Sequence, residues 1–145
     1  MDGEEFLKVA QELAEGPREA HRRSAISRAY YAAFHSVCEV LRRNSINIPE
    51  NPGGHMVAIR CLDYSRDANL AQAGSKLGTL HGNRRHADYE LGKRLGTLQA
   101  ALDIRLASQV INIVKQSPLR SPDSVEAANI RKMQQKLHEQ GQQGR

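Results

Sequence analysis

The feature that most constrains this chain is a regular helical periodicity between Pro17 and Asn44, where apolar side chains recur at steps of three and four residues. Pro17 suits the first turn of such a helix, because the amide that proline lacks would have no partner there. A long helix with one apolar stripe buries that stripe against other helices, so the pattern predicts an α-helical core. The stripe consists of Ile26, Tyr30, Ala33, Val37 and Val40.

A second long apolar pattern runs from Leu91 to Gln116 and predicts the closing helix of the same core. Substitutions that place a carboxylate on either stripe, Leu98→Asp or Ala33→Asp, are expected to unfold the domain. The face that we assign to the core of the closing helix is Leu91, Leu95, Leu98, Leu102, Leu106, Val110 and Ile113.

Shorter helical patterns complete the predicted fold. Asp2 can cap a first helix that ends near Gly16, and a loop rich in Pro and Gly over residues 45–54 precedes a further helix near His55. Leu70, Ala73, Leu77, Leu80 and Arg84 share one helical face. We therefore expect an all-α fold, an up-and-down bundle of four or five helices that occupies residues 1–117.

Residues 118–145 are expected to form a flexible or partly helical C-terminal arm. Pro118 and Pro122 separate this segment from the bundle, and its end is rich in Gln. A short helix over residues 123–138 fits the spacing of its few apolar side chains, and we expect the arm to be dispensable for folding. Those side chains are Ala127, Ile130, Met133 and Leu137.

Charge and composition narrow the function classes. The net charge of +5 permits binding to nucleic acid or to an acidic protein and requires neither. Cys38 and Cys61 are far apart among apolar residues, which argues against a disulfide framework or a zinc site. No metal-ligand spacing, cofactor motif, signal peptide or membrane span is apparent, so we expect a cytoplasmic protein without metal or cofactor.

The opposite face of the 17–44 helix carries a polar stripe at helical spacing. A solvated surface is one interpretation of this stripe, and a ligand-binding groove is the other. Arg28, Tyr31 and His35 are its candidate binding residues. The full stripe is His21, Ser24, Arg28, Tyr31, His35, Glu39 and Arg42.

The run Ser27-Arg28-Ala29-Tyr30-Tyr31-Ala32-Ala33-Phe34-His35, then His55, then Arg85-His86-Ala87-Asp88-Tyr89, resembles HEPN domains of the UPF0332-like branch over roughly residues 3–116. The resemblance implies a helical bundle that commonly forms a homodimer. It also implies a setting beside a minimal nucleotidyltransferase in prokaryotic toxin–antitoxin or defence systems. Many such relatives are metal-independent ribonucleases, whose motif is Arg followed by a polar residue and, four to six positions after the Arg, a His.

This chain departs from that motif. Counting forward from Arg84 or Arg85 reaches no histidine at the family spacing, and the next histidine after His86 is His138 in the arm. The family's catalytic pair therefore cannot be transferred to this chain. The candidate catalytic residues are Arg84, Arg85 and His86, because arginine can bind phosphate and histidine can transfer protons.

Asp88 and Tyr89 join Arg28, Tyr31 and His35 as candidate binding residues. The structural alternative is that Arg85 and Asp88 form an ion pair at a break between two helices, with Asp88 as the cap of the second. Tyr89 would then be a packed aromatic residue.

Two functions follow from these observations. One is a HEPN-like component that binds RNA or nucleotide, with metal-independent ribonuclease activity. The other is a non-catalytic dimerising module that binds a partner protein such as a nucleotidyltransferase. The Arg-Arg-His segment favours the first, and the missing family spacing favours the second.

Overall fold

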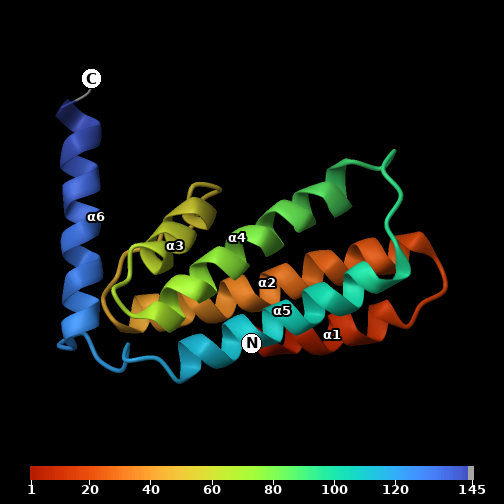
Figure 1. Cartoon of the computed structure of the whole chain (residues 1–145), viewed down its shortest axis with the longest axis horizontal. Helices are drawn as coiled ribbons and strands as arrows, with labels where there is room; N and C mark the ends of the chain where they lie inside the picture. Colours follow the sequence, from red (N-terminus) through yellow and green to blue (C-terminus); the bar gives the residue numbers. More distant parts are fainter. Residues whose placement is uncertain (144–145) are drawn as a thin grey trace.

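The computed structural model describes residues 1–143, and over these residues the chain is all-helical. Four helices run lengthwise and form the body of the bundle, while two others lie at one end of it (Figure 1). The predicted all-α bundle is therefore confirmed. The lengthwise helices are α1 (Glu4–Ala14), α2 (Glu19–Arg43), α4 (Ala68–Tyr89) and α5 (Thr97–Lys115), and the others are α3 (Gly54–Asp63) and α6 (Val125–Gln143).

Helix α2 is the centre of the core, as its periodicity predicts. Every residue of its expected apolar stripe is buried. The helix ends at Asn44, whose side-chain amide donates to the carbonyl of Val40 at 2.7 Å and to that of Leu119 at 3.1 Å. Ser45 follows with φ of 59°, the left-handed conformation that commonly terminates helices. This capping satisfies one carbonyl of α2 and joins its end to the chain beyond α5.

The predicted apolar face of α4 is also buried, at Leu70, Ala73, Leu77 and Leu80. Asp67 caps this helix by accepting a hydrogen bond from the Leu70 amide at 2.9 Å. Glycine is required at position 74, because an added Cβ would lie 2.3 Å from a carboxylate oxygen of Asp63 and 2.8 Å from the Asp63 amide nitrogen. The absence of a side chain at Gly74 therefore lets α3 and α4 pack closely.

The alternative that Arg85 and Asp88 form an ion pair at a break between two helices is wrong, because α4 continues without interruption to Tyr89. Asp88 lies in the last turn of this helix and caps no later one. Arg23 satisfies the end of α4 instead: its guanidinium donates to the carbonyl of Ala87 at 2.8 Å. A buried side chain from α2 thus satisfies carbonyl groups at the end of α4, a contact that the local sequence does not indicate.

The closing helix differs from the prediction in its first residue and in its buried face. Helix α5 begins at Thr97 instead of Leu91, and only the second half of its predicted face, at Leu106, Val110 and Ile113, packs on the core. Leu98 and Leu102 are 73% and 57% exposed. In the first half of α5 the small side chains of Ala100 and Asp103 face the bundle, so Leu98 and Leu102 lie on the outer side. The buried positions are Ala100, Asp103, Ala107, Val110, Ile111 and Val114.

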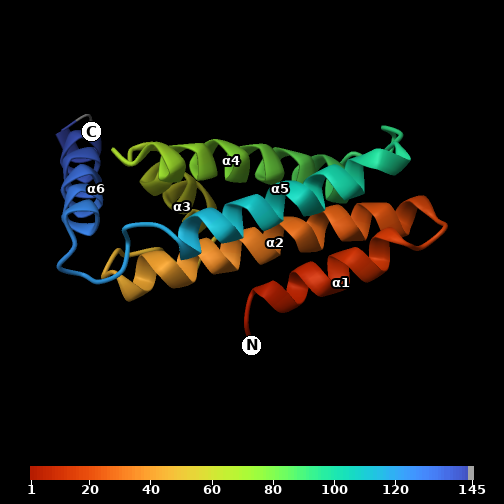
Figure 2. The same cartoon turned by 60° about the horizontal axis from the view of Figure 1, so that its bottom comes forward.

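The predicted arm forms the helix α6, which stands across the end of the bundle (Figure 2). Leu119, Ala127 and Ile130 are buried and belong to the main apolar core, so the first half of the arm contributes to that core. Residues 144–145 of the predicted arm lie outside the described residues. Within residues 1–143, no helix combines the length and the apolar character needed to cross a membrane.

Candidate functional site

Three helices bring a group of polar aromatic and cationic side chains together. Tyr30 and Tyr31 come from the middle of α2, His55 from the first turn of α3, and His81 and Arg84 from successive turns of α4. We call these five residues the His–Tyr–Arg cluster. His55, His81, Tyr31 and Arg84 are partly exposed, whereas Tyr30 is fully buried beneath them.

The rings of the cluster are in direct contact. The Tyr30 hydroxyl oxygen lies 2.5 Å from Nδ1 of His55, a hydrogen-bond distance. The imidazole rings of His55 and His81 are stacked, with their centroids 5.5 Å apart and their planes 28° apart. Phe34 closes the other side of His55, with its ring centroid at 4.5 Å. The two imidazoles are thus held beside each other by packing.

Arg84 places a cation over these rings. Its side chain is only 11% exposed, and its guanidinium carbon lies 5.6 Å from the ring centroid of Tyr30 and 5.7 Å from that of Tyr31. One terminal nitrogen is 3.7 Å from a carboxylate oxygen of Asp88, which also accepts a hydrogen bond from the Ser27 hydroxyl at 3.1 Å. The buried Nε of Arg84 has no hydrogen-bond partner in the described part of the chain. Because Nε is buried, an anion can reach this guanidinium only through its terminal nitrogens.

Burial is the main cause of the altered proton affinities in the cluster. It lowers the pKa of His55 and of His81, and the positive charge of Arg84 lowers both further. Burial also raises the pKa of Tyr30, so its hydroxyl keeps its proton. At neutral pH both imidazoles are therefore neutral and the Tyr30 phenol is protonated, beside the cation of Arg84.

The polar stripe of α2 continues from the cluster through Tyr31. The guanidinium carbon of Arg28 lies 5.1 Å from the ring centroids of both Tyr31 and Phe6. His35 stacks on Phe6 with centroids 5.5 Å apart, and on Tyr31 with centroids 5.9 Å apart. The structure thus brings the predicted binding residues Arg28, Tyr31 and His35 together, and it places them beside Arg84.

The predicted catalytic residues Arg84, Arg85 and His86 do not lie on the same side of α4. Consecutive helical residues point about 100° apart, so only Arg84 reaches α2, while Arg85 and His86 lie on the exposed side of α4. His86 contacts Glu90, with Nδ1 and a carboxylate oxygen 2.5 Å apart. Asp88 pairs with Arg84, which replaces the expected pair with Arg85. Tyr89 is exposed, with its ring centroid 5.9 Å from the Arg84 guanidinium carbon.

The candidate site residues predicted from the sequence did not include His55, His81 or Tyr30. Tyr30 belongs to the apolar stripe, His55 was named only as part of the family resemblance, and His81 lies in no motif. One local signal was present: His81 and Arg84 are three positions apart, a spacing that places them on the same face of a helix. Within residues 1–143, no three His, Cys, Asp or Glu side chains are grouped so that they can hold a metal ion.

Comparison of the chain with models of protein families, with curated proteins and with solved structures gives no match. The fold and the site alone therefore define the class: an all-α bundle with a half-buried His–Tyr–Arg cluster that joins three helices.

Proposed function

We propose that this chain is a HEPN-like component of a cytoplasmic prokaryotic toxin–antitoxin or defence system, and that it binds RNA and cleaves it without a metal ion. The observation that carries the proposal is the pair of stacked imidazoles, His55 and His81, beside the guanidinium of Arg84. This cluster replaces the Arg84, Arg85 and His86 segment as the proposed catalytic centre.

The chemistry of RNA cleavage matches this set of groups. Attack by a 2′-hydroxyl requires a base for its proton, an acid for the departing 5′-oxygen and a cation for the added negative charge on the phosphate. In the proposed reaction His55 and His81 transfer the two protons, and Arg84 binds the phosphate. Tyr30 is a positioning residue, because its hydroxyl holds Nδ1 of His55 at 2.5 Å.

The lowered pKa values of the two histidines fit this assignment. A neutral imidazole can accept the 2′-hydroxyl proton directly. A phosphate that binds at Arg84 adds negative charge near both rings, and this charge favours the protonated form of the second imidazole. Substrate binding would thereby produce the acid that the free protein lacks at neutral pH.

The surface next to the cluster suits single-stranded RNA. Unpaired bases stack on aromatic rings and on guanidinium planes, and Tyr31, His35 and Arg28 supply both. A strand whose phosphate lies at Arg84 could therefore place an adjacent base on this stripe.

A cleavage assay with chelator present tests the proposal. His55→Gln, His81→Gln and Arg84→Gln should each lower the rate of RNA cleavage by about a hundred- to ten-thousand-fold, the usual effect of losing a proton-transfer or charge-stabilising group. Arg85→Gln and His86→Gln on the exposed side of the same helix are the matched controls and should cleave normally. Loss of activity only in the two controls would move the site to the segment that the sequence suggested.

The second candidate function is a non-catalytic module that dimerises and binds a partner protein, for example a minimal nucleotidyltransferase. The exposed leucines of α5 favour it, because Leu98 and Leu102 place large apolar side chains one turn apart on the surface. We propose that this face forms the homodimer contact.

Light scattering tests the dimer face, and an RNA-binding assay on the same protein distinguishes the two candidates. Twice the chain mass for the wild-type protein and the single chain mass for Leu98→Ser/Leu102→Ser would support the dimer face. A protein that dimerises but neither cleaves nor binds RNA at low salt would favour the interaction module.

A further inference from the structure

The end of the bundle where the arm returns contains a second feature, separate from the His–Tyr–Arg cluster. Helices α3 and α6 enclose a pocket of about 350 Å³. This volume lies within the range of about 300 to 1,000 Å³ that is usual for small-molecule sites. Its lining includes Val57, Arg60, Tyr64, Ile130, Met133 and Leu137.

Polar contacts at the start and along the edge of α6 hold this pocket open. Glu126 accepts hydrogen bonds from the Ser65 hydroxyl at 2.6 Å and from the Arg66 amide at 3.2 Å. Arg131 donates to the carbonyl of Asn44 at 2.7 Å, and Gln134 donates to that of Asn47 at 3.1 Å. These bonds fix α6 against the bundle independently of its apolar face.

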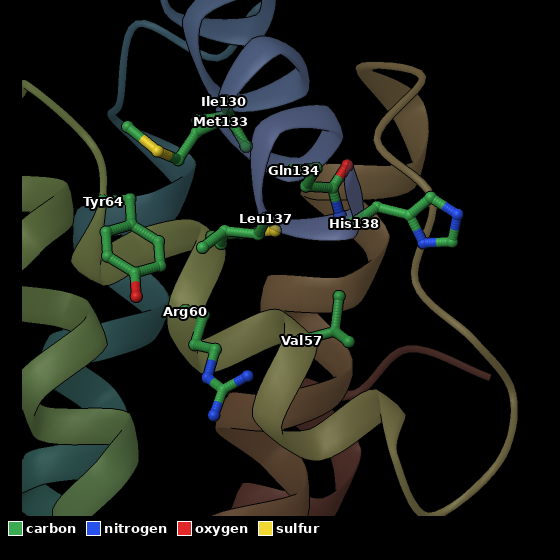
Figure 3. Close-up of a pocket in the computed structure, with 9 residues that line it drawn as sticks. Val57, Arg60, Tyr64, Ile130, Met133, Gln134, Leu137 and His138 are labelled. Carbon is green, nitrogen blue, oxygen red and sulfur yellow. The ribbon is translucent and has the colours of Figure 1, made fainter. Parts of the chain in front are cut away.

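Beyond Ile130 the apolar face of α6 has no close partner in the bundle. Ile130 is buried, Met133 is half-buried, and Leu137 is 37% exposed. In Figure 3 the side chain of Leu137 lies above Arg60 and Val57 of α3, with Tyr64 beside it. The α6 side of the pocket therefore combines the apolar side chains of Ile130, Met133 and Leu137 with the polar ones of Gln134 and His138.

The charge of the pocket is one-sided. No Asp or Glu lines it, whereas Arg60 does. Within the described residues Arg60 forms no ion pair, so its guanidinium is free to bind an anion. Cys61 adds no charge to the lining, because burial raises the pKa of its thiol to about 12.

We propose that this pocket binds an unbranched alkyl carboxylate of medium chain length, with the hydrocarbon chain against Met133 and Leu137 and the carboxylate on Arg60. Burial of the chain removes exposed apolar surface of both ligand and protein from water. The guanidinium can bind the carboxylate through two charge-assisted hydrogen bonds. The ligand contacts both helices and so fastens the arm to the bundle.

Decanoate titration followed through the methionine methyl groups tests this proposal. The chain has three methionines, and with 13C-labelled methyl groups each gives one NMR signal. Met133 lines the pocket, whereas Met1 and Met56 lie outside it and are internal controls. A saturable shift of the Met133 signal alone is expected. Equal shifts of all three signals, or no shift of Met133, would overturn the site.

Variants and a neutral analogue test the role of charge. Arg60→Gln should weaken decanoate binding by about tenfold, the effect of losing a charge-assisted hydrogen-bonded pair. Arg66→Gln removes a neighbouring exposed cation that does not line the pocket, and it should bind as the wild type does. Decanol should bind about tenfold more weakly than decanoate. Equal affinity of decanol and decanoate, or of Arg60→Gln and wild type, would refute an anion site.

Discussion

Helices α2 and α5 both contribute to the apolar core of the bundle, and they bury different kinds of surface. α2 buries large side chains such as Ile26, Tyr30 and Leu41. α5 buries two alanines, three β-branched residues and the carboxyl group of Asp103, whereas its Leu98 and Leu102 are exposed. The contrast shows that α2 buries large apolar side chains along its length, whereas α5 leaves two of its leucines, Leu98 and Leu102, on the surface.

The largest expected effect is a direct test of this contrast. Ala33→Asp should unfold the domain, because burial of an unpaired carboxylate costs several kcal/mol against a total stability of about 5 to 15 kcal/mol. Leu98→Asp, on the exposed face of α5, should change the free energy of unfolding by only about 0.5 kcal/mol. Thermal melts of the two variants measure this. Equal destabilisation would mean that the outer face of α5 is also buried.

The next largest effect on stability is expected from deletion of the chain beyond α5. Deletion of residues 118–145 removes the buried side chains of Leu119 and Ile130 and exposes the Asn44 amide at the end of α2. We expect the free energy of unfolding to fall by about 2 to 4 kcal/mol, because full burial of one such side chain contributes about 1.5 to 3 kcal/mol. Urea denaturation checks this. An unchanged midpoint would support the arm as the dispensable element that the sequence predicted.

The third prediction concerns how the melting temperature depends on pH through His55 and His81, which pack beside α2. The folded pKa values of His55 and His81 lie below the ordinary value of 6.5, so the unfolded chain binds more protons in mildly acidic solution. The melting temperature should therefore fall as the pH drops below about 6.5. In His55→Gln/His81→Gln this fall should be smaller. Parallel pH profiles for the variant and the wild type would contradict burial as the cause.

The smallest expected effect on stability concerns Asp103 of α5. Its contribution changes with pH in the direction opposite to that of the two histidines. Burial raises the pKa of Asp103 above its ordinary value of 3.8, although Gln99 and Asn83 donate hydrogen bonds to one of its oxygens. Its contribution to stability is therefore lost as the pH rises above about 3.8, and neutral pH is unfavourable for it. Asp103→Asn should stabilise the fold at pH 7 by about 1 kcal/mol or less. Urea denaturation at pH 7 and at pH 4 should show the gain only at pH 7.

The same two helices explain how far the sequence could predict the fold. The stripe of α2 combines large apolar residues with one helical face, so its buried side was evident. In α5 the leucines and the alanines form two neighbouring faces, and hydrophobicity favoured the leucines. Which face packs depends on how closely α5 approaches its neighbours, and this distance is set by tertiary contacts.

The site was less predictable than the fold. Arg28, Tyr31 and His35 share a helix face, so their proximity followed from spacing. His55 and His81 come together only because α3 and α4 pack against the same part of α2, and no sequence interval indicates that contact. Arg84 and Arg85 are adjacent in the chain, yet only one of them faces the cluster.

The missing side chain at Gly74 has a consequence for how the cluster is maintained. Because α3 and α4 touch backbone to backbone near Asp63, the two helices should move as one rigid body. His55 is carried by the first and His81 by the second, so their separation does not depend on a mobile loop. The two imidazoles are thereby preorganised: little reorganisation is needed before a ligand arrives, and a bulky residue far from either ring could misalign them.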